Sequence, residues 1–363
     1  MDPAELLEHV VREAVARGAS DVRLKVPSPP LVRVNRHLEH LDVPALTPDQ
    51  TESILALMMA GLPNAAKQTE FERRGEVDFA FTRRELGRFR INAFRQRGSI
   101  SIVMRVVPYG VRALAELNLP PVVAELAELE SGLILVCGPT SSGTTTTMAA
   151  MLDHVNRTQT RAIVTVEDPI EALHADNLSS IDQREVGLDT PSAADALASI
   201  LRQDADIVLI SHVGEQATAE GALHAAESGA LVIAGLPTND ICDAFSRIVS
   251  FFPVHQQGIA RQSLAATLQA GLGMRLVRAP DGRTRYPAAE IIRGTPQVRS
   301  AIASADPPER LLELMRAGEA GMQTFEQALA RLVDSDMADT DEAADVTRNG
   351  RIARHDPTPT GSR

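Results

Sequence analysis

The sequence predicts an α/β protein in which a small mixed domain precedes a larger domain built on a parallel-rich sheet flanked by helices. The main observation is a series of short apolar runs, rich in β-branched residues, that begins after Gly132. Their apolarity is continuous rather than alternating, which is typical of strands covered on both faces. Helical stretches separate these runs, as expected when crossover helices join parallel strands. The first third of the chain instead contains alternating segments, which indicate strands with one exposed face.

The N-terminal domain is predicted to span residues 1–112. It begins with a helix-like stretch from Glu5 to Arg17 and continues into short alternating segments. The pattern ends in a region bounded by Pro108 and Pro121, and the domain boundary is placed there. The predicted strands of this domain are residues 21–26, 31–34, 76–81 and 88–94.

The second domain is predicted to span residues 113–335, with a tail at 336–363. The tail region contains an acidic stretch, 334–345, and a polar stretch with several arginines, 346–363. Such a composition cannot bury enough apolar surface to order itself, so the tail is expected to be disordered. The strands expected in the second domain are 133–136, 162–166, 207–210 and 231–233, and its last helices are 307–317 and 324–333.

Composition excludes several classes of function. The formal net charge of −12 and the aromatic content of 3% oppose nucleic-acid binding, which depends on basic side chains and stacking platforms. Two cysteines, Cys137 and Cys242, are too few for a disulfide framework or a four-cysteine site, so no structural zinc is expected. The sequence shows neither a secretory leader nor a long apolar span, which predicts a cytoplasmic protein.

A turn of small residues follows the first apolar run of the second domain and precedes a helix start. Its spacing matches a phosphate loop, G-x-x-x-x-G-K-[ST], except that Thr144 occupies the lysine position. In such a loop Thr145 would hold Mg²⁺, provided that a nucleotide binds. The alternative is an ordinary Ser/Thr-rich turn at a helix N-terminus. The candidate nucleotide-binding residues are Gly138, Pro139, Thr140, Ser141, Ser142, Gly143, Thr144, Thr145 and Thr146.

Segments on both sides of this loop resemble the secretion-ATPase superfamily, and most closely its PilT/PilU-type pilus-retraction motors. They are GASD at 18–21, RFRINAF at 88–94, VTVEDPIE at 164–171, SIDQREVG at 180–187, LRQDADIVLI at 201–210 and FPVHQQ at 252–257. The resemblance covers residues 5–335. It implies a PAS-like N-terminal domain and a RecA-like C-terminal domain, assembled as a hexamer that hydrolyses ATP at subunit boundaries. Glu167 and Glu171 match family positions near Mg²⁺ and the attacking water, although a solvated strand end would also explain them.

Several family positions carry other residues in this chain. His212 stands where the family has its catalytic glutamate, and it is interpreted either as a substituted base or as a histidine that packs at a strand end. Ala230 and Pro237 occupy positions where the family has histidines, and neither side chain can donate a hydrogen bond. The segment 297–302 replaces a family stretch associated with retraction and keeps Arg299.

These substitutions favour a member that keeps the family architecture but has lost ATP hydrolysis, acting as a structural or regulatory subunit. ATP and Mg²⁺ then bind only if residual affinity persists. The expected partners are further copies in a homo-hexamer, or an active pilus motor in a mixed assembly, and the inner-membrane platform protein of the pilus, which predicts peripheral attachment at the inner face of the membrane. Whether the loss is natural or engineered stays open.

Two alternatives remain. One is an active or weakly active retraction motor that uses displaced residues, with arginines acting on a neighbouring subunit; the candidates are Arg90, Arg95 and Arg97, which could equally be solvated strand charges. The other is a nucleic-acid motor of the same fold, which the net charge of −12 opposes.

Overall fold

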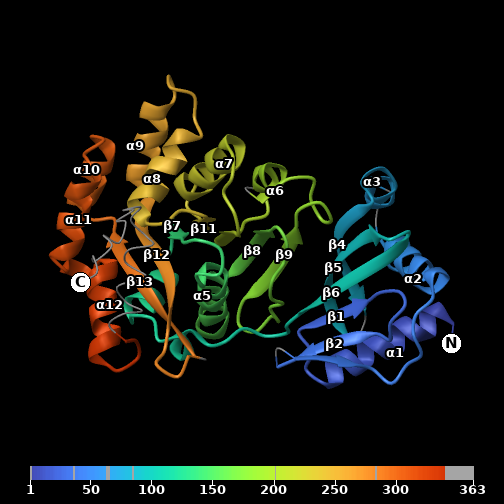
Figure 1. The fold of residues 1–363 in the computed structure, drawn as a ribbon. Helices are drawn as coiled ribbons and strands as arrows, with labels where there is room; N and C mark the ends of the chain where they lie inside the picture. Colours follow the sequence, from blue (N-terminus) through green and yellow to red (C-terminus); the bar gives the residue numbers. More distant parts are fainter. Residues whose placement is uncertain are drawn as a thin grey trace, which may run out of the picture. The chain divides into compact units, whose positions relative to one another are not determined.

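The computed structural model describes residues 2–35, 37–62, 66–83, 86–200, 202–282 and 284–339. They form two compact units (Figure 1). The first unit comprises Met1–Gly110 together with Pro169–His174 and Glu185–Pro191. The second comprises Val111–Asp168, Ala175–Arg184 and Ser192–Arg363. Two short segments from the middle of the chain therefore belong with the N-terminal unit.

The first unit is a six-stranded antiparallel sheet in the order β3-β2-β1-β6-β5-β4. Its core lies on one face of the sheet, where α1 and α2 pack with apolar side chains such as Val10, Ile54 and Phe89. The sheet is built from β1 (Asp21–Leu24), β2 (Leu31–Val34), β3 (His37–His40), β4 (Glu76–Arg83), β5 (Gly87–Gln96) and β6 (Ser99–Val107), with α1 (Pro3–Ala16), α2 (Pro48–Ala60) and α3 (Ala66–Arg74).

The second unit is built on a seven-stranded sheet in the order β13-β12-β7-β11-β10-β8-β9. Strands β12, β7, β11, β10 and β8 run parallel to one another, and β13 is antiparallel to β12. The strands are β7 (Gly132–Cys137), β8 (Ala162–Glu167), β9 (Ser180–Glu185), β10 (Ile207–Ile210), β11 (Leu231–Leu236), β12 (Leu268–Arg278) and β13 (Arg285–Arg293).

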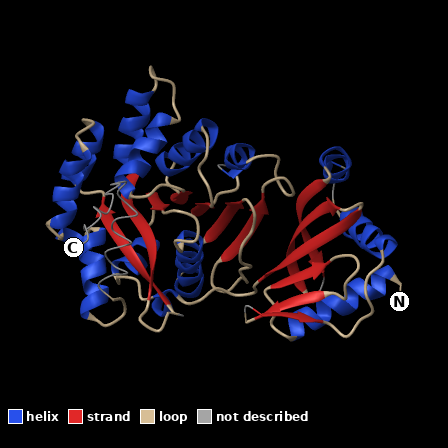
Figure 2. Cartoon of the chain, viewed as in Figure 1, coloured by secondary structure: helices blue, strands red, loops and turns tan. Residues whose placement is uncertain are grey.

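Helices pack on both sides of this sheet (Figure 2). The central strands β7, β10 and β11 are buried at every residue, which confirms the expectation drawn from their continuous apolarity. The helices are η1 (Leu114–Leu117), α4 (Val122–Ala127), α5 (Thr144–Thr158), α6 (Ala193–Ile200), α7 (Gln216–Glu227), α8 (Ile241–Ser250), α9 (Gln257–Thr267), α10 (Pro296–Ala303), α11 (Pro308–Arg316), η2 (Glu319–Gly321) and α12 (Phe325–Asp334).

Most of the predicted tail lies outside the described residues. Near the start of the predicted tail, Ala338 is described, and its side chain is buried in a small cluster with Phe325, Val277 and Ala288. Within the part of the chain that the structure describes, no helix is both long and apolar enough to cross a membrane.

Glu290 on β13 is a buried carboxyl group beneath the N-terminus of α8. Its Oε1 accepts a hydrogen bond from the Ile241 N–H at 2.6 Å, and the residue is 3% exposed. Burial raises the pKa of Glu290 to about 8, and the carboxylate of Asp240 adds to the increase, whereas the hydrogen bond from Ile241 and the guanidinium of Arg275 oppose it. Between about pH 4.5 and pH 8, Glu290 therefore keeps its proton in the folded state, whereas the same carboxyl group in the unfolded chain has released it.

This shift predicts how stability depends on pH. Because the folded pKa lies above the ordinary value of 4.5, protonation of Glu290 stabilises the fold below about pH 4.5, and this contribution is lost as pH rises through about 8. Glu290→Gln cannot ionise, so its free energy of unfolding should rise relative to the unsubstituted chain by up to about 1.4 kcal/mol per pH unit across that window. Urea unfolding in 1 M salt, where exposed charges are screened, measures the difference. If the free energy of unfolding depended on pH in the same way in Glu290→Gln and in the unsubstituted chain, the prediction would be contradicted.

Candidate functional site

The segments that follow four parallel strands gather at one edge of the second sheet. Since β7, β11, β10 and β8 are parallel neighbours in that order, their carboxyl ends lie at the same edge. The loop from Gly138 follows β7, Pro237 follows β11, His212 follows β10, and Glu167 ends β8. Neighbouring strands lie about 4.8 Å apart, so the axes of β7 and β8 are roughly 14 Å apart.

The loop after β7 has the shape of an anion cradle. A Cβ atom on Gly138 would lie 2.3 Å from Ser142 Oγ and 2.6 Å from the Met274 carbonyl oxygen, so only glycine fits there. Gly143 adopts φ 98° at the N-cap of α5 and provides no side-chain cap. The backbone N–H groups of the first turn of α5 are therefore not capped by a side chain, and such groups bind anions.

Two further features of this loop bear on a phosphate ligand. The Ser142 hydroxyl oxygen is buried and has no hydrogen-bond partner among the described residues. Ser141 adopts φ 67°, a left-handed conformation that glycine adopts more readily than serine. These backbone features fit a phosphate group. The side chain at the family lysine position does not, because Thr144 carries no charge.

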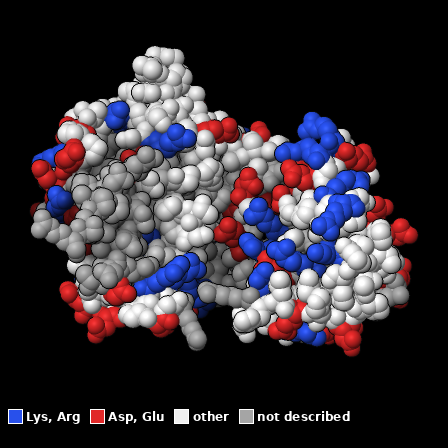
Figure 3. Space-filling model, in the orientation of Figure 1, with Lys and Arg blue, Asp and Glu red and all other residues white. Residues whose placement is uncertain are grey.

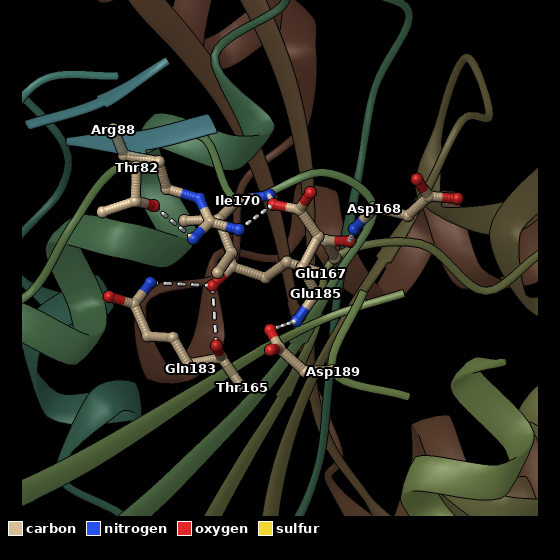
Figure 4. A network of polar contacts seen from close by, with 10 residues as sticks. Thr82, Arg88, Thr165, Glu167, Asp168, Ile170, Gln183, Glu185 and Asp189 are labelled. Atoms are coloured by element: carbon tan, nitrogen blue, oxygen red, sulfur yellow. Dashed lines mark hydrogen bonds and ion pairs between the residues drawn. The ribbon is translucent and has the colours of Figure 1, made fainter. Parts of the chain in front are cut away.

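Glu167 is fixed by hydrogen bonds within the second unit (Figure 4). Its Oε1 accepts from the Thr165 hydroxyl at 2.6 Å and from Gln183 Nε2 at 3.0 Å, and the residue is 7% exposed. The next residue, Asp168, donates its N–H to Ser211 Oγ at 3.1 Å, which links the ends of β8 and β10. The carboxylate of Glu167 thus has a defined position at the carboxyl edge.

Glu171 belongs to the first unit, although it follows Glu167 by four positions. Its segment is held by Glu185, whose Oε2 accepts the Ile170 N–H at 3.1 Å and Arg88 Nη2 at 2.8 Å (Figure 4). The side chains of Arg88 and Glu185 are 12% and 7% exposed, so this is a buried ion pair. Sequence reasoning missed both residues, although both lie in segments that carry the family resemblance.

The substituted positions do not all lie together. His212 is exposed after β10, and a Cβ on Gly214 would lie 2.7 Å from His212 Nε2, so the ring lies over that glycine. Pro237 is exposed at the same edge. Ala230 instead precedes β11, and its carbonyl oxygen accepts the Gly132 N–H at 3.0 Å. It therefore lies at the opposite edge of the sheet, roughly 20 Å along the strand from Pro237.

The three candidate arginines differ in their surroundings within the first unit. The guanidinium of Arg95 lies 5.2 Å from the centre of the Phe71 ring, a cation–π contact. Arg97, with φ 47°, forms the tight turn between β5 and β6 with Gly98. Arg90 is exposed and pairs in register with Arg105 on the open face of the sheet. Figure 3 shows Lys and Arg side chains grouped over the part of this view that the first unit occupies.

Arg299 has a structural position at the end of α9. Its Nε donates to the Gly294 carbonyl oxygen at 2.7 Å, and its Nη1 donates to the carbonyl oxygen of Ala266. A guanidinium that donates to the last carbonyl groups of a helix satisfies acceptors that the helix leaves open. Arg299, the residue kept from the family segment associated with retraction, thus connects α10 to the end of α9.

Replacing this arginine tests the connection. Arg299→Ala should lower the free energy of unfolding by about 1–3 kcal/mol, because charge-assisted hydrogen bonds to partly buried carbonyl groups are lost. Arg310→Ala is the matched control, since its ion pair with Glu313 is exposed and should contribute less than about 1 kcal/mol. Denaturant unfolding of both variants measures the effects, and equal losses would exclude a special role for Arg299.

Comparison with known proteins places the chain among pilus motors. A family model described as "Type II/IV secretion system protein" matches residues 3–348. The chain is 36% identical over 326 residues to the "Type IV pilus ATPase PilU" of Pseudomonas aeruginosa, covering 90% of this chain and 84% of that protein. It is 34% identical over 348 residues to the "Type IV pilus retractation ATPase PilT" of the same organism, covering 96% and 98%.

Solved structures agree with this placement. The crystal structure of the pilus retraction motor PilT with bound ADP superposes with a TM-score of 0.82 at 37% identity, covering 93% of this chain and 96% of that one. The Legionella pneumophila ATPase DotB has the same fold, with a TM-score of 0.84 at 20% identity over 97% of each chain. The predicted fold class is confirmed, and the chain belongs to the type II/IV secretion system protein family, among its PilT/PilU-type pilus ATPases.

Proposed function

We propose that this chain is a pilus-motor family protein that has lost ATP hydrolysis and acts as a structural or regulatory subunit in twitching motility or secretion. The observation that supports this proposal is Thr144 in a loop that otherwise keeps its strand, its close glycine contact and its uncapped helix start. The backbone of a phosphate loop is retained, whereas its cationic side chain is replaced.

Nucleotide binding should be weak rather than absent. In the PilT structure with bound ADP the family fold holds a nucleotide. In this chain the N–H groups from Ser142 to Thr146 would contact the phosphates, and Thr145 would supply the hydroxyl for Mg²⁺. Bound ATP with Mg²⁺ would supply the phosphoryl group for hydrolysis. A lost charge-assisted hydrogen bond weakens binding by roughly 1.5–3 kcal/mol, which is about 10- to 150-fold in affinity.

Hydrolysis should be impaired more strongly than binding. The lysine of a phosphate loop acts on charge that builds up during phosphoryl transfer, and Thr144 supplies none. His212 offers no carboxylate beside the position of Mg²⁺, and Pro237 lacks both a donor side chain and a backbone N–H. The remaining carboxylates, Glu167 and Glu171, do not replace the positive charge that the loop lacks.

The proposal includes an assembly. PilU and PilT are named as pilus ATPases, which supports a role in a pilus motor; the assembly proposed for this chain is a homo-hexamer or a mixed assembly with an active motor. The chain would then work at the cytoplasmic face of the inner membrane, against the platform protein of the pilus. This role requires the architecture of the motor but no turnover.

Nucleotide binding and phosphate release, measured on the same preparation, test the proposal. We expect saturable but weak ATP binding at millimolar Mg²⁺ and no phosphate release above that of the buffer. Glu171→Gln serves as the control for contaminating ATPases, because it removes a carboxylate at the family site without changing the loop. Phosphate release that this substitution abolishes would contradict the proposed loss of hydrolysis.

A further inference from the structure

The loop after β7 keeps the groups that surround one part of a nucleotide and lacks the group that reaches another. In a phosphate loop, backbone N–H groups cradle the α- and β-phosphates, whereas the lysine reaches the β- and γ-phosphates. The backbone groups are present in this chain, with Gly143 at φ 98° and no side-chain cap on the first turn of α5. The lysine is absent, because residue 144 is a threonine. The cradle for a diphosphate is therefore retained, whereas the charge that holds a terminal third phosphate is not.

The hydroxyl group of Ser142 is a further donor inside this loop. Ser142 is 4% exposed, and its Oγ is buried without a hydrogen-bond partner among the described residues. The hydroxyl is turned toward Gly138, since a Cβ atom on that glycine would lie 2.3 Å from Oγ. A buried hydroxyl group is costly to leave without a partner, and it can donate to an acceptor such as a phosphate oxygen. This side chain therefore supplements the backbone N–H groups as a ligand for the phosphate nearest the loop.

The carboxyl edge of the second sheet carries negative charge around this loop. The segments that begin at the ends of β7, β8, β10 and β11 contain four carboxyl groups and neither lysine nor arginine. The segments are residues 138–147, 167–168, 211–215 and 237–240. The carboxyl groups are those of Glu167, Asp168, Glu215 and Asp240. Each additional phosphate group of a ligand brings more negative charge to an edge that is already negative, and like charges repel.

Strand β12, the other neighbour of β7, carries two arginines near its end. Arg275 donates to the Asn239 carbonyl oxygen at 3.1 Å, and its guanidinium lies 4.3 Å from the centre of the Phe325 ring. Arg278 is exposed and ends β12, five positions beyond Gly273, which pairs with the last residue of β7. Five residues of strand are roughly 17 Å long. Arg275 therefore has partners of its own, and Arg278 lies far along its strand from the end of β7.

We propose that the loop of this chain binds a nucleoside diphosphate in preference to a nucleoside triphosphate. The β-phosphate receives the N–H groups of the loop and the Ser142 hydroxyl group, whereas a γ-phosphate adds negative charge beside the carboxyl groups of the edge with no lysine to receive it. The inference rests on the proposed function, because a subunit that hydrolyses ATP has to hold the γ-phosphate. The preferred ligand is a product of triphosphate hydrolysis, so a reaction of that class must supply it.

Isothermal titration of the full chain with two probes tests this preference. The probes are ADP and the non-hydrolysable analogue β,γ-imido-ATP, each with millimolar Mg²⁺. We expect ADP to bind at least about 10-fold more tightly than the analogue. Thr144→Lys should remove or reverse this preference, because its ammonium group reaches the γ-phosphate. Thr158→Lys is the matched control, since it adds the same charge at the exposed C-terminal end of α5 and should leave the ratio of affinities unchanged. Equal affinities of the unsubstituted chain for the two probes would overturn the proposal.

Two further variants test the position of the ligand and the source of the preference. Ser142→Ala should weaken the binding of both probes about 2- to 10-fold and keep their ratio, because a hydrogen bond to the shared phosphate is lost. The unfolding temperature of the ligand-free variant shows that its fold is intact. Unchanged ADP affinity in Ser142→Ala would place ADP outside the loop and overturn the proposal. Arg278→Gln should leave the ratio unchanged, and a changed ratio would show that this arginine takes the part of the missing lysine, which contradicts the charge argument.

The result is separable from the test of the proposed function. Phosphate release from ATP, measured on the same preparation, reports on hydrolysis alone, whereas the ratio of the two affinities reports on the diphosphate preference. Release that Glu171→Gln abolishes would contradict the loss of hydrolysis. Equal affinities for the two probes without phosphate release would overturn the diphosphate preference and leave the proposed loss of hydrolysis intact.

Discussion

A variant that combines Thr144→Lys with His212→Glu is expected to release phosphate from ATP about 100-fold faster than the buffer background, which is the rate expected of the unsubstituted chain. The physical reason is that the loop backbone already has the required shape. Gly138 makes its close contact with Ser142, and α5 starts at Thr144 without a side-chain cap. The two substitutions supply the charges that act on the transferring phosphoryl group, and they leave Pro237 unchanged.

The two substitutions should separate binding from chemistry. Thr144→Lys alone is expected to tighten ATP binding about 10-fold or more, and His212→Glu adds turnover by placing a carboxylate after β10. Isothermal titration and phosphate release measure the two effects. Thr158→Lys is the matched control, because it adds the same charge to the exposed C-terminal end of α5, away from the loop. Tighter binding in both lysine variants would show that bulk charge, and not the loop position, is responsible.

Arg88→Met is expected to lower the free energy of unfolding of the first unit by about 3 kcal/mol. The substitution leaves the Glu185 carboxylate, 7% exposed, without the guanidinium that lies 2.8 Å from it. Loss of one partner of a buried ion pair leaves an uncompensated charge, which explains the size of the effect. Hydrogen exchange at Ile170 should also become faster, because its N–H is bonded to the same carboxylate.

Two comparisons make this second prediction specific. Arg90→Met removes an exposed arginine two positions along the same strand and should change stability by less than about 0.5 kcal/mol. Adding Glu185→Gln to Arg88→Met should restore part of the lost stability, because the unpaired charge is then absent. Urea unfolding and exchange at Ile170 are the measurements. Equal losses in the Arg88 and Arg90 variants would mean that the ion pair contributes nothing particular.

The parallel strands could be predicted from sequence because their signal is local. Runs such as residues 207–210 are apolar at each position, and burial on both faces requires this. The β12–β13 hairpin was not predicted, since Gly271 and Gly273 interrupt its apolar pattern. A Cβ on Gly271 would lie 2.3 Å from Ile241, and one on Gly273 would lie 2.3 Å from Glu290, so these glycines are required by tertiary packing.

The candidate site could be predicted only in part for the same reason. Gly138 and Glu167 follow runs of strand residues, so their place at the carboxyl edge follows from the pattern itself. The pairing of Arg88 with Glu185 joins residues far apart in sequence and depends on the folded register. Ala230 and Pro237 were grouped by family position, whereas a whole strand separates them. To predict which residues lie together in space, the direction of the strand must be known as well as the motif.

The acidic segment after β8 is divided between the two units of the chain. Glu167 is held by residues of the second unit, and Glu171 belongs to the first, with the boundary between Asp168 and Pro169. Any movement of one unit relative to the other therefore changes the separation of these two carboxylates.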